Sequence, residues 1–280
     1  MSFFTKEDGK VREIFRFSAQ PELENPSLIV AWKNDAGGLS REVVGCLNRA
    51  IGAKSFCELD PVRFFSLGGV TIEKNVAGFP EGKFYCGRRN DLVIFEGDEP
   101  ELERHEFLNA LTDLARDHLK IRDLYTIGGT VSAIAHTGSR GLLAVFNQTK
   151  FRERLAGPGL EDMTWEGPPA VSSYLLWVAA RRGIPGVSLW PQVPFYLAVG
   201  QDFKAAKVTL SFLDERFDLG LDFGPLDDRI DDQDKTISRI REDDPDVDKY
   251  ISMLESELSL APEERVELTE KIAGALEQQA

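Results

Sequence analysis

The feature that most constrains the fold is a repeated pairing of a short apolar run with a segment of helical periodicity. The first run covers residues 28–32, and glycines at positions 37 and 38 separate it from apolar positions at helical spacing that end before Gly52. Continuous apolar runs are typical of strands buried on both faces of a sheet. The pattern therefore predicts an α/β protein whose largely parallel or mixed sheet is covered by helices.

The same pairing recurs further along the chain. Residues 91–96 precede a helical pattern that reaches Leu119, and residues 142–146 and 187–190 are two more apolar runs. Ser40 is expected to cap the helix of the first pair, because its hydroxyl can accept a hydrogen bond from a backbone N–H of the first turn.

Two other segments carry different patterns. Residues 62–89 alternate between apolar and polar side chains and contain Gly68 and Gly69 at turn-like positions, which predicts hairpins. Residues 171–182 are apolar on almost every side, which predicts a helix in the centre of the protein rather than at its surface.

Negative charge is concentrated at the C-terminal end. The formal net charge is −14, and residues 225–280 alone carry 17 acidic and 7 basic side chains without any strand-like run. Asp244 and Pro245 are suited to start a helix, and a second helix is expected from Pro262. The first of these helices has an apolar stripe made of Val247, Tyr250, Ile251, Leu254 and Leu258. We therefore expect an α/β core domain over residues 1–224 and an acidic helical C-terminal extension over residues 225–280.

Charge and hydropathy argue against several classes of protein. An acidic surface repels the phosphate backbone of nucleic acids, and no cluster of basic residues interleaved with aromatic ones offsets it. The sequence has no run of roughly 20 apolar residues for a membrane span, and its start lacks the pattern of a signal peptide. Three cysteines without metal-ligand spacing suit a reducing compartment. We expect a cytoplasmic protein that binds neither nucleic acid nor membrane.

Two glycine-containing segments follow the strand-like runs at residues 28–32 and 124–127 and form the candidate ligand site. In residues 34–40, glycines at a helix start can leave backbone N–H groups free for an anion. This segment and residues 128–130 are both expected at the carboxyl edge of the sheet, where α/β folds collect ligands, and a histidine beside Ser139 and Arg140 could meet an anionic ligand there. The alternative is that the glycines only form tight turns. The candidate ligand-binding residues are Asp35, Gly37, Gly38, Gly128, Gly129 and His136.

The sequence contains no recognisable catalytic or metal-binding constellation. Three histidines leave little material for a metal site or a Ser-His-Asp relay. The glycine segments match neither a dinucleotide-binding nor a Walker-type motif, and Ser173 is not in a nucleophile elbow. Residues 227–234 are rich in aspartate but lack the glycine and the final glutamate of an EF-hand loop. We predict no catalytic residue, no metal and no cofactor.

The order and spacing of several weak motifs resemble the proteasome assembly chaperone 2 family over roughly residues 25–222. The motifs are residues 28–31 with Gly37-Gly38, 91–97 with Pro100, 124–129, 167–171 with 174–176, 183–185 and 194–196. The resemblance implies a phosphorylase/hydrolase-like α/β fold, namely a three-layer sandwich with a mixed, partly barrel-like central sheet, to which the C-terminal helical extension is added. It also implies assembly into oligomers and no established catalysis.

Members of that family help to assemble the core proteasome, and some dock through a C-terminal hydrophobic-tyrosine-any-residue tail. Residues 276–280 do not have this pattern, so docking of that kind is not expected. The resemblance favours a non-enzymatic protein-interaction or assembly-chaperone-like protein that acts as a homo-oligomer, most simply a trimer, with another protein complex as a further partner. The alternatives are a protein that binds a nucleoside or phosphorylated ligand, an enzyme of phosphorylase-like type and, as a third, an ATP-dependent carboxylate–amine ligase.

Overall fold

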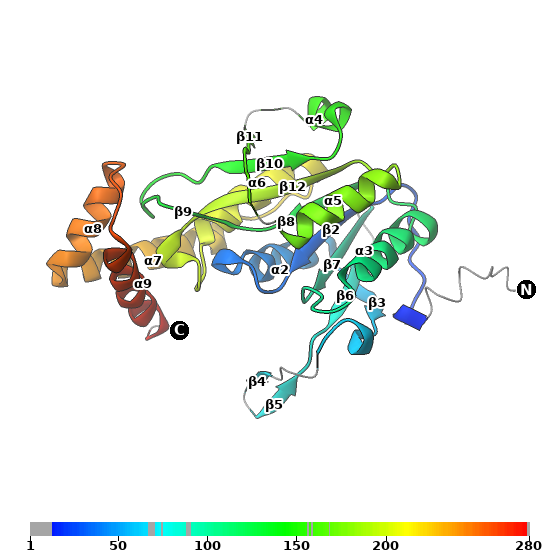
Figure 1. The fold of residues 1–280 in the computed structure, drawn as a ribbon, viewed down its shortest axis with the longest axis horizontal. Helices are drawn as coiled ribbons and strands as arrows, with labels where there is room; N and C mark the ends of the chain where they lie inside the picture. Colours follow the sequence, from blue (N-terminus) through cyan, green and yellow to red (C-terminus); the bar gives the residue numbers. More distant parts are fainter. Residues whose placement is uncertain are drawn as a thin grey trace, which may run out of the picture.

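The computed structural model describes residues 13–66, 71–73, 75–87, 91–155, 157, 159–167 and 169–278. Its centre is a mixed sheet of ten strands with helices on both faces (Figure 1). Across the sheet the order is β1 (Phe15–Phe17), β3 (Lys54–Leu59), β6 (Gly82–Cys86), β7 (Leu92–Gly97), β2 (Ser27–Trp32), β8 (Asp123–Ile127), β12 (Gly186–Pro194), β10 (Leu142–Phe146) and β11 (Glu161–Asp162), while β9 (Thr130–Ser132) pairs with the end of β12.

The middle of the sheet is parallel. β2 pairs with β7 on one side and with β8 on the other, and β8 pairs with β12, all in parallel. Antiparallel pairs lie outside this group, where β12 pairs with β10, and where β7, β6, β3 and β1 pair in turn. The predicted mixed sheet is confirmed.

A separate hairpin extends away from the sheet (Figure 1). It consists of β4 (Thr71–Glu73) and β5 (Val76–Gly78), which pair in antiparallel orientation and follow the short 3-10 helix η2 (Pro61–Arg63). The prediction of a hairpin within residues 62–89 is therefore confirmed for these two strands, whereas Gly68 and Gly69 lie outside the described residues.

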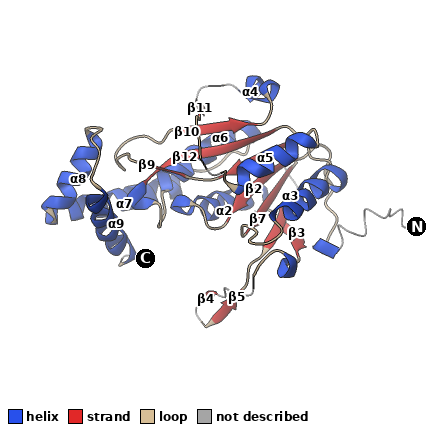
Figure 2. Ribbon diagram, in the orientation of Figure 1, coloured by secondary structure: helices blue, strands red, loops and turns tan. Residues whose placement is uncertain are grey.

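Helices cover both faces of the sheet and complete three layers (Figure 2). One face packs against α2 (Leu39–Ile51) and α6 (Phe203–Phe217), and the other against α3 (Arg104–Asp113), its π-helical continuation η3 (Leu114–His118) and α5 (Val171–Arg181). Every residue of β2 is buried, and its side chains alternate between the two faces. Ile29 belongs to the cluster under α2 and α6, and Leu28 to the cluster under α3 and α5. The predicted three-layer sandwich is confirmed.

α5 lies at the surface, which corrects the prediction of a central helix over residues 171–182. Its inner side buries Leu175, Leu176 and Ala179, whereas Tyr174 and Trp177 are 45% and 46% exposed. Tyrosine and tryptophan count as apolar in a periodicity analysis, yet both have a polar group and a large surface that suit partial exposure. Because of these two aromatic residues, the sequence pattern did not reveal that α5 is amphipathic.

Three helices follow α6 at one end of the molecule (Figure 1): α7 (Gly224–Asp243), α8 (Pro245–Glu255) and α9 (Pro262–Glu277). Asp244 caps α8 as predicted, because its carboxylate accepts hydrogen bonds from the backbone N–H groups of Asp246 and Val247. The predicted apolar stripe is buried up to Leu254, whereas Leu258 lies beyond the end of the helix and is 55% exposed.

The apolar side chains of these helices are continuous with those on the α2 and α6 side of the sheet. α9 packs against η4 (Phe195–Leu197), the 3-10 turn that follows β12. The C-terminal helical extension is thus present, and its division from the core at residue 224 stays a prediction. Among the described residues, no helix combines the length and the apolar character needed to cross a membrane.

Candidate functional site

The two glycine-containing segments predicted to bind a ligand lie in direct contact. They follow β2 and β8, which are adjacent and parallel, so both emerge at the same edge of the sheet. A Cβ atom at Gly129 would lie 2.6 Å from the carbonyl oxygen of Ala36, and one at Gly128 would lie 2.8 Å from the ring of Trp190. Only glycine permits this close approach at positions 128 and 129. Gly37 and Gly38 have positive φ angles of 74° and 58°, a backbone conformation that also favours glycine.

The start of α2 is capped by a side chain from the segment just before the helix. Asp35 Oδ2 accepts hydrogen bonds from the backbone N–H and from the hydroxyl of Ser40, each at 2.9 Å. The backbone N–H of Gly37 donates to the carbonyl of Ala198 at 2.8 Å. Ser40 is therefore not the cap that the sequence predicted: it lies inside the helix, and Asp35 supplies the capping carboxylate from outside. This carboxylate occupies the place that an external anion would take at the helix start.

Asp35 is unusual in its second oxygen. Oδ1 is buried and has no hydrogen-bond partner within the described part of the chain. Burial raises the pKa of this carboxyl group to about 6, although the hydrogen bonds from Ser40 act in the opposite direction. A carboxyl group with such a pKa changes charge within the range of weakly acidic buffers.

We expect Asp35→Asn to remove a pH-dependent part of the stability. Because the pKa of Asp35 is higher in the folded than in the unfolded protein, the folded state holds the proton more tightly between about pH 4 and pH 6. The contribution of Asp35 to the free energy of unfolding is therefore fully present below about pH 4 and is lost as the pH rises through 6. The difference in stability between wild type and Asp35→Asn should fall across this range in urea titrations. Parallel curves for the two proteins would contradict the raised pKa.

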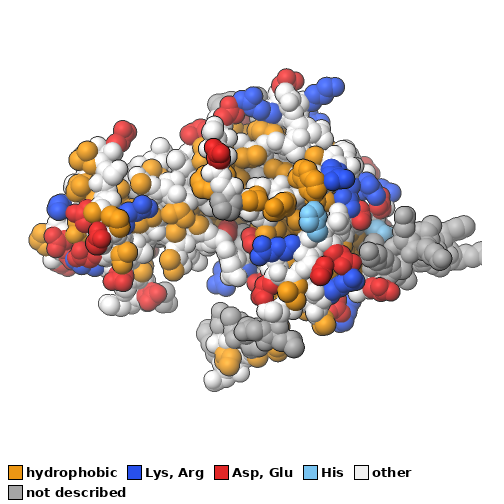
Figure 3. Space-filling model, viewed as in Figure 1, with side chains coloured by type: hydrophobic (Ala, Val, Ile, Leu, Met, Phe, Trp, Pro, Cys, Tyr) orange, Lys and Arg blue, Asp and Glu red, His pale blue; other side chains and the backbone are white. Residues whose placement is uncertain are grey.

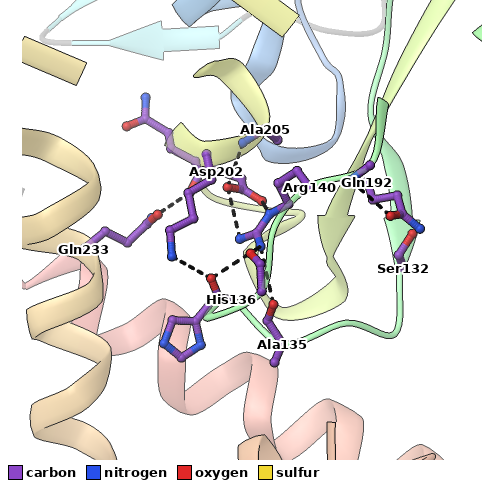
Figure 4. A network of polar contacts seen from close by, with 12 residues as sticks. Ser132, Ala135, His136, Arg140, Gln192, Asp202, Ala205 and Gln233 are labelled. Atoms are coloured by element: carbon purple, nitrogen blue, oxygen red, sulfur yellow. Dashed lines mark hydrogen bonds and ion pairs between the residues drawn. The ribbon is translucent and has the colours of Figure 1, made fainter. Parts of the chain in front are cut away.

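A buried ion pair lies next to the glycine segments (Figure 4). The side chains of Arg140 and Asp202 are 1% and 0% exposed, and they meet with Nε 2.8 Å from Oδ2 and Nη2 3.4 Å from Oδ1. Nη1 of Arg140 also donates to the carbonyl of Gly138 at 2.8 Å. Asp202 in turn accepts from the backbone N–H of Ala205 and so caps α6, while its own N–H donates to the carbonyl of Gly37.

His136 is buried beside this ion pair. Its Nδ1 lies 3.0 Å from the hydroxyl of Tyr196, which also accepts a hydrogen bond from the backbone N–H of His136. Burial lowers the pKa of the imidazole to about 4, so the ring is neutral near pH 7. The carbonyl of His136 accepts a hydrogen bond from Lys204, which also forms an ion pair with Asp234 of α7. The His136 segment thus connects the sheet edge to the C-terminal helices.

The structure brings all six predicted ligand-binding residues into one region, and it also shows how their polar groups are used. Partners within the protein occupy the N–H of Gly37, Oδ2 of Asp35 and Nδ1 of His136, whereas Oδ1 of Asp35 has none among the described residues. Arg140, which the sequence suggested could meet an anionic ligand with His136, meets the carboxylate of Asp202 instead. Ligand binding at this edge stays a prediction. The pairing with Asp202 was not predicted, since 62 residues separate the partners.

Groups of acidic, histidine or cysteine side chains that could hold a metal ion are not found among the described residues. The aspartate-rich start of α7 is instead engaged with lysines. Asp227 pairs with Lys207, and Asp234 pairs with Lys204. These ion pairs hold α7 against α6.

A second feature lies on the other face of the sheet, where aromatic side chains are exposed. Tyr174 and Trp177 are three residues apart and so share one side of α5. The ring of His105 in α3 lies between the two helices, with its centroid 6.3 Å from that of Tyr174 and 5.8 Å from that of Trp177. We call these three residues the aromatic surface. Figure 3, viewed from this side, shows hydrophobic side chains gathered over α5.

A positive charge borders the aromatic surface. The guanidinium carbon of Arg181 lies 4.8 Å from the ring centroid of Trp177, a distance at which a cation is attracted to the face of the ring. Within the described residues Arg181 has no carboxylate partner. The sequence signal that marks this surface is the pair Tyr174 and Trp177 on an otherwise aliphatic helix.

One protein-family model covers most of the chain. The model of the PAC2 family matches residues 28–241, which is most of the chain. The chain belongs to the PAC2 family. The match runs from β2 into α7 and thus includes the sheet except for β1, both helical layers and the buried ion pair. The resemblance noted in the sequence is confirmed.

Solved structures share the fold of this PAC2 protein. One is a protein of unknown function from Corynebacterium glutamicum, with a TM-score of 0.76, 19% identity, and coverage of 87% of this chain and 96% of that one. A PAC2 family protein from Streptomyces avermitilis has a TM-score of 0.68 and 23% identity, with 77% and 96% covered. A proteasome-assembly chaperone homologue from Mycobacterium tuberculosis has a TM-score of 0.68 and 20% identity, with 80% and 99% covered. The search of curated proteins gives no match.

Proposed function

We propose that this PAC2 protein is a non-enzymatic, assembly-chaperone-like protein that acts as a homo-oligomer and engages another protein complex. The observation that carries the proposal is the aromatic surface on α5 and α3. Tyrosine, tryptophan and arginine are the residues most often found at the energetic centres of protein interfaces. Here all three types are adjacent on one exposed helix face.

A second copy of the chain is the occupant that the charges favour. The exposed side of α9 carries Glu263, Val266 and Glu270, spaced three and four residues apart. These carboxylates complement Arg181, and Val266 complements the aromatic rings. A contact between α9 of one copy and α5 of the next joins two different surfaces, and such contacts generate closed rings when the rotation between copies is suitable. A trimer is the simplest ring of this kind.

The relatives support an assembly role. The similar protein from Mycobacterium tuberculosis is a proteasome-assembly chaperone homologue. An oligomer of the present chain would carry several identical surfaces, which suits the binding of a multi-subunit complex by multivalent contact. The proposal therefore assigns the chain a protein partner and no reaction.

We expect the double substitution Tyr174→Ser and Trp177→Ser to weaken self-association at least tenfold. Each truncation at an interface centre costs about 2 kcal/mol or more, and about 1.4 kcal/mol is a factor of ten. Size-exclusion chromatography with light scattering measures the effect over a range of concentrations. Both residues are half-exposed, so the melting temperature of the monomer should change little.

The matched control is Val62→Ser, because Val62 is 85% exposed and lies on η2, away from α5. It should leave the oligomer intact. A wild-type protein that remains monomeric at high micromolar concentration, or a double variant that associates like wild type, would contradict self-association through this surface.

The partner complex is identified by affinity purification from the native host with chemical crosslinking. Wild type should recover the subunits of one complex in fixed ratio, and the crosslinks should map to surface residues of this chain. Recovery of this chain alone would contradict an assembly role. A rise in melting temperature with nucleosides, which carry no phosphate, would instead favour the small-molecule alternative at the glycine segments.

A further inference from the structure

Three arginines converge on one buried carboxylate at the opposite end of β8 from the glycine segments. Asp123 is the first residue of β8, and its side chain is 1% exposed. Arg216 Nη2 lies 3.3 Å from Asp123 Oδ2, Arg154 Nη2 lies 3.5 Å from the same oxygen, and Arg122 Nε lies 3.5 Å from Oδ1. The arginines come from α6, from α4 (Thr149–Leu155) and from the residue before β8. Three separate parts of the chain are therefore needed to build this arginine cluster.

Neighbouring side chains hold the arginines in place. Arg122 Nε donates to the hydroxyl of Ser27 at 3.0 Å, and Arg216 Nε donates to the hydroxyl of Tyr125 at 2.7 Å. The guanidinium carbon of Arg154 lies 4.8 Å from the ring centroid of Phe151. Each guanidinium thus has at least one contact that orients it besides its contact with Asp123. A group oriented before binding loses less conformational entropy when a ligand arrives.

The charges of the four residues do not balance. Three guanidinium groups meet one carboxylate, which leaves an excess of two positive charges in a chain whose net charge is −14. A carboxylate offers about four acceptor positions, whereas each guanidinium has five N–H donors. The side chains of Arg154, Arg122 and Arg216 remain 60%, 36% and 26% exposed, so their unused donors are accessible from solvent.

We propose that the arginine cluster binds a phosphate group. A phosphate carries up to two negative charges at neutral pH, which matches the excess, and its oxygens accept paired hydrogen bonds from guanidinium groups. The cluster lies at the amino end of β8, whereas the glycine segments lie beyond its carboxyl end, about 16 Å away along the strand. It is therefore separate from the candidate site at the sheet edge and from the aromatic surface. The cluster takes inorganic phosphate or the phosphate group of a larger molecule.

Thermal unfolding of the full chain in inorganic phosphate tests the proposal. Potassium chloride at the same ionic strength separates binding from charge screening. We expect phosphate to raise the melting temperature of wild type by about 2–4 °C over chloride when its concentration is several times the Kd. Arg154→Gln should lose most of this rise, because it removes one charge and the most exposed donors. Arg154 is largely exposed, so the variant is expected to fold.

Arg152→Gln is the matched control. Arg152 lies two residues away on the same helix and pairs with Asp162 rather than with Asp123. This variant should keep the phosphate-dependent rise, and isothermal titration should give a Kd for phosphate at least ten times weaker for Arg154→Gln than for Arg152→Gln. A rise no larger in phosphate than in chloride, or an equal rise in both variants, would overturn the proposal and leave the arginines as partners of Asp123 alone. Self-association through the aromatic surface is measured separately and is unaffected by that outcome.

Discussion

Asp202→Ala is expected to lower the free energy of unfolding by about 3–5 kcal/mol, because it leaves the guanidinium of Arg140 buried without its counter-charge. The same substitution removes the carboxylate that caps α6, which adds about 1 kcal/mol. Urea unfolding followed by circular dichroism measures the change. This ion pair joins the start of α6 to the segment before β10, so its loss should also loosen the contact with Gly37.

Two further variants separate the contribution of the Asp202 charge to stability from the contribution of Asp202 as the cap of α6. Asp202→Asn keeps an oxygen that can cap α6 but removes the charge, so it should recover only the smaller part of the loss. Arg140→Met combined with Asp202→Asn removes the unpaired charge and should be more stable than Asp202→Ala. Asp162→Ala breaks an exposed ion pair with Arg152 and should have little effect. A stability of Asp202→Ala within about 1 kcal/mol of wild type would contradict the assigned role of the buried pair.

Ile251→Ala is expected to cost about 2–5 kcal/mol, the range for truncation of a fully buried isoleucine. Ile251 lies on α8, and its side chain belongs to the same apolar cluster as Leu39 of α2 and Leu210 of α6. The loss arises because the space left by the side chain is only partly filled by relaxation of its neighbours. Leu258→Ala is the control, since Leu258 follows the helix and is exposed, and it should change stability by less than about 0.5 kcal/mol.

The shape of the unfolding curve of Ile251→Ala tests whether the helices after residue 224 unfold separately from the sheet. We expect one cooperative transition, because α7 and α9 share buried contacts with α6 and η4. If the acidic helices formed an independent body, the variant would show an early transition for those helices and an unchanged one for the sheet. That outcome would contradict the continuous apolar cluster as a source of cooperativity.

Local features of the chain were predictable where neighbours in sequence decide them. The run that became β2 is apolar at successive positions, and such a run is stable only when both of its faces are covered. Asp244 and Pro245 mark the start of α8 because a cap acts on the first turn of its own helix. Periodicity failed on α5, since aromatic side chains are compatible with both a buried and a half-exposed position.

Features of the candidate site were predictable only in part. The glycines of both loops pointed to a close approach of backbones, and the structure places Gly129 against Ala36. Some partners of the polar groups at this edge come from elsewhere in the chain: Ala198 for the N–H of Gly37, and Asp202 for Arg140. The sequence alone offered no reason to pair these residues.

By itself, the sequence determined the class of fold, the positions of the buried strands β2, β7, β10 and β12 and of several helices, the acidic character of the C-terminal helices and the likeness to the PAC2 family. These properties follow from side chains within a few residues of one another, whose spacing decides which face of an element can be buried. Only the tertiary structure decided that α5 exposes its aromatic residues, that Arg140 pairs with Asp202, and that Asp123 contacts three arginines. Each of these depends on where distant elements meet, and burial, charge and hydrogen bonding between them exist only after the chain has folded.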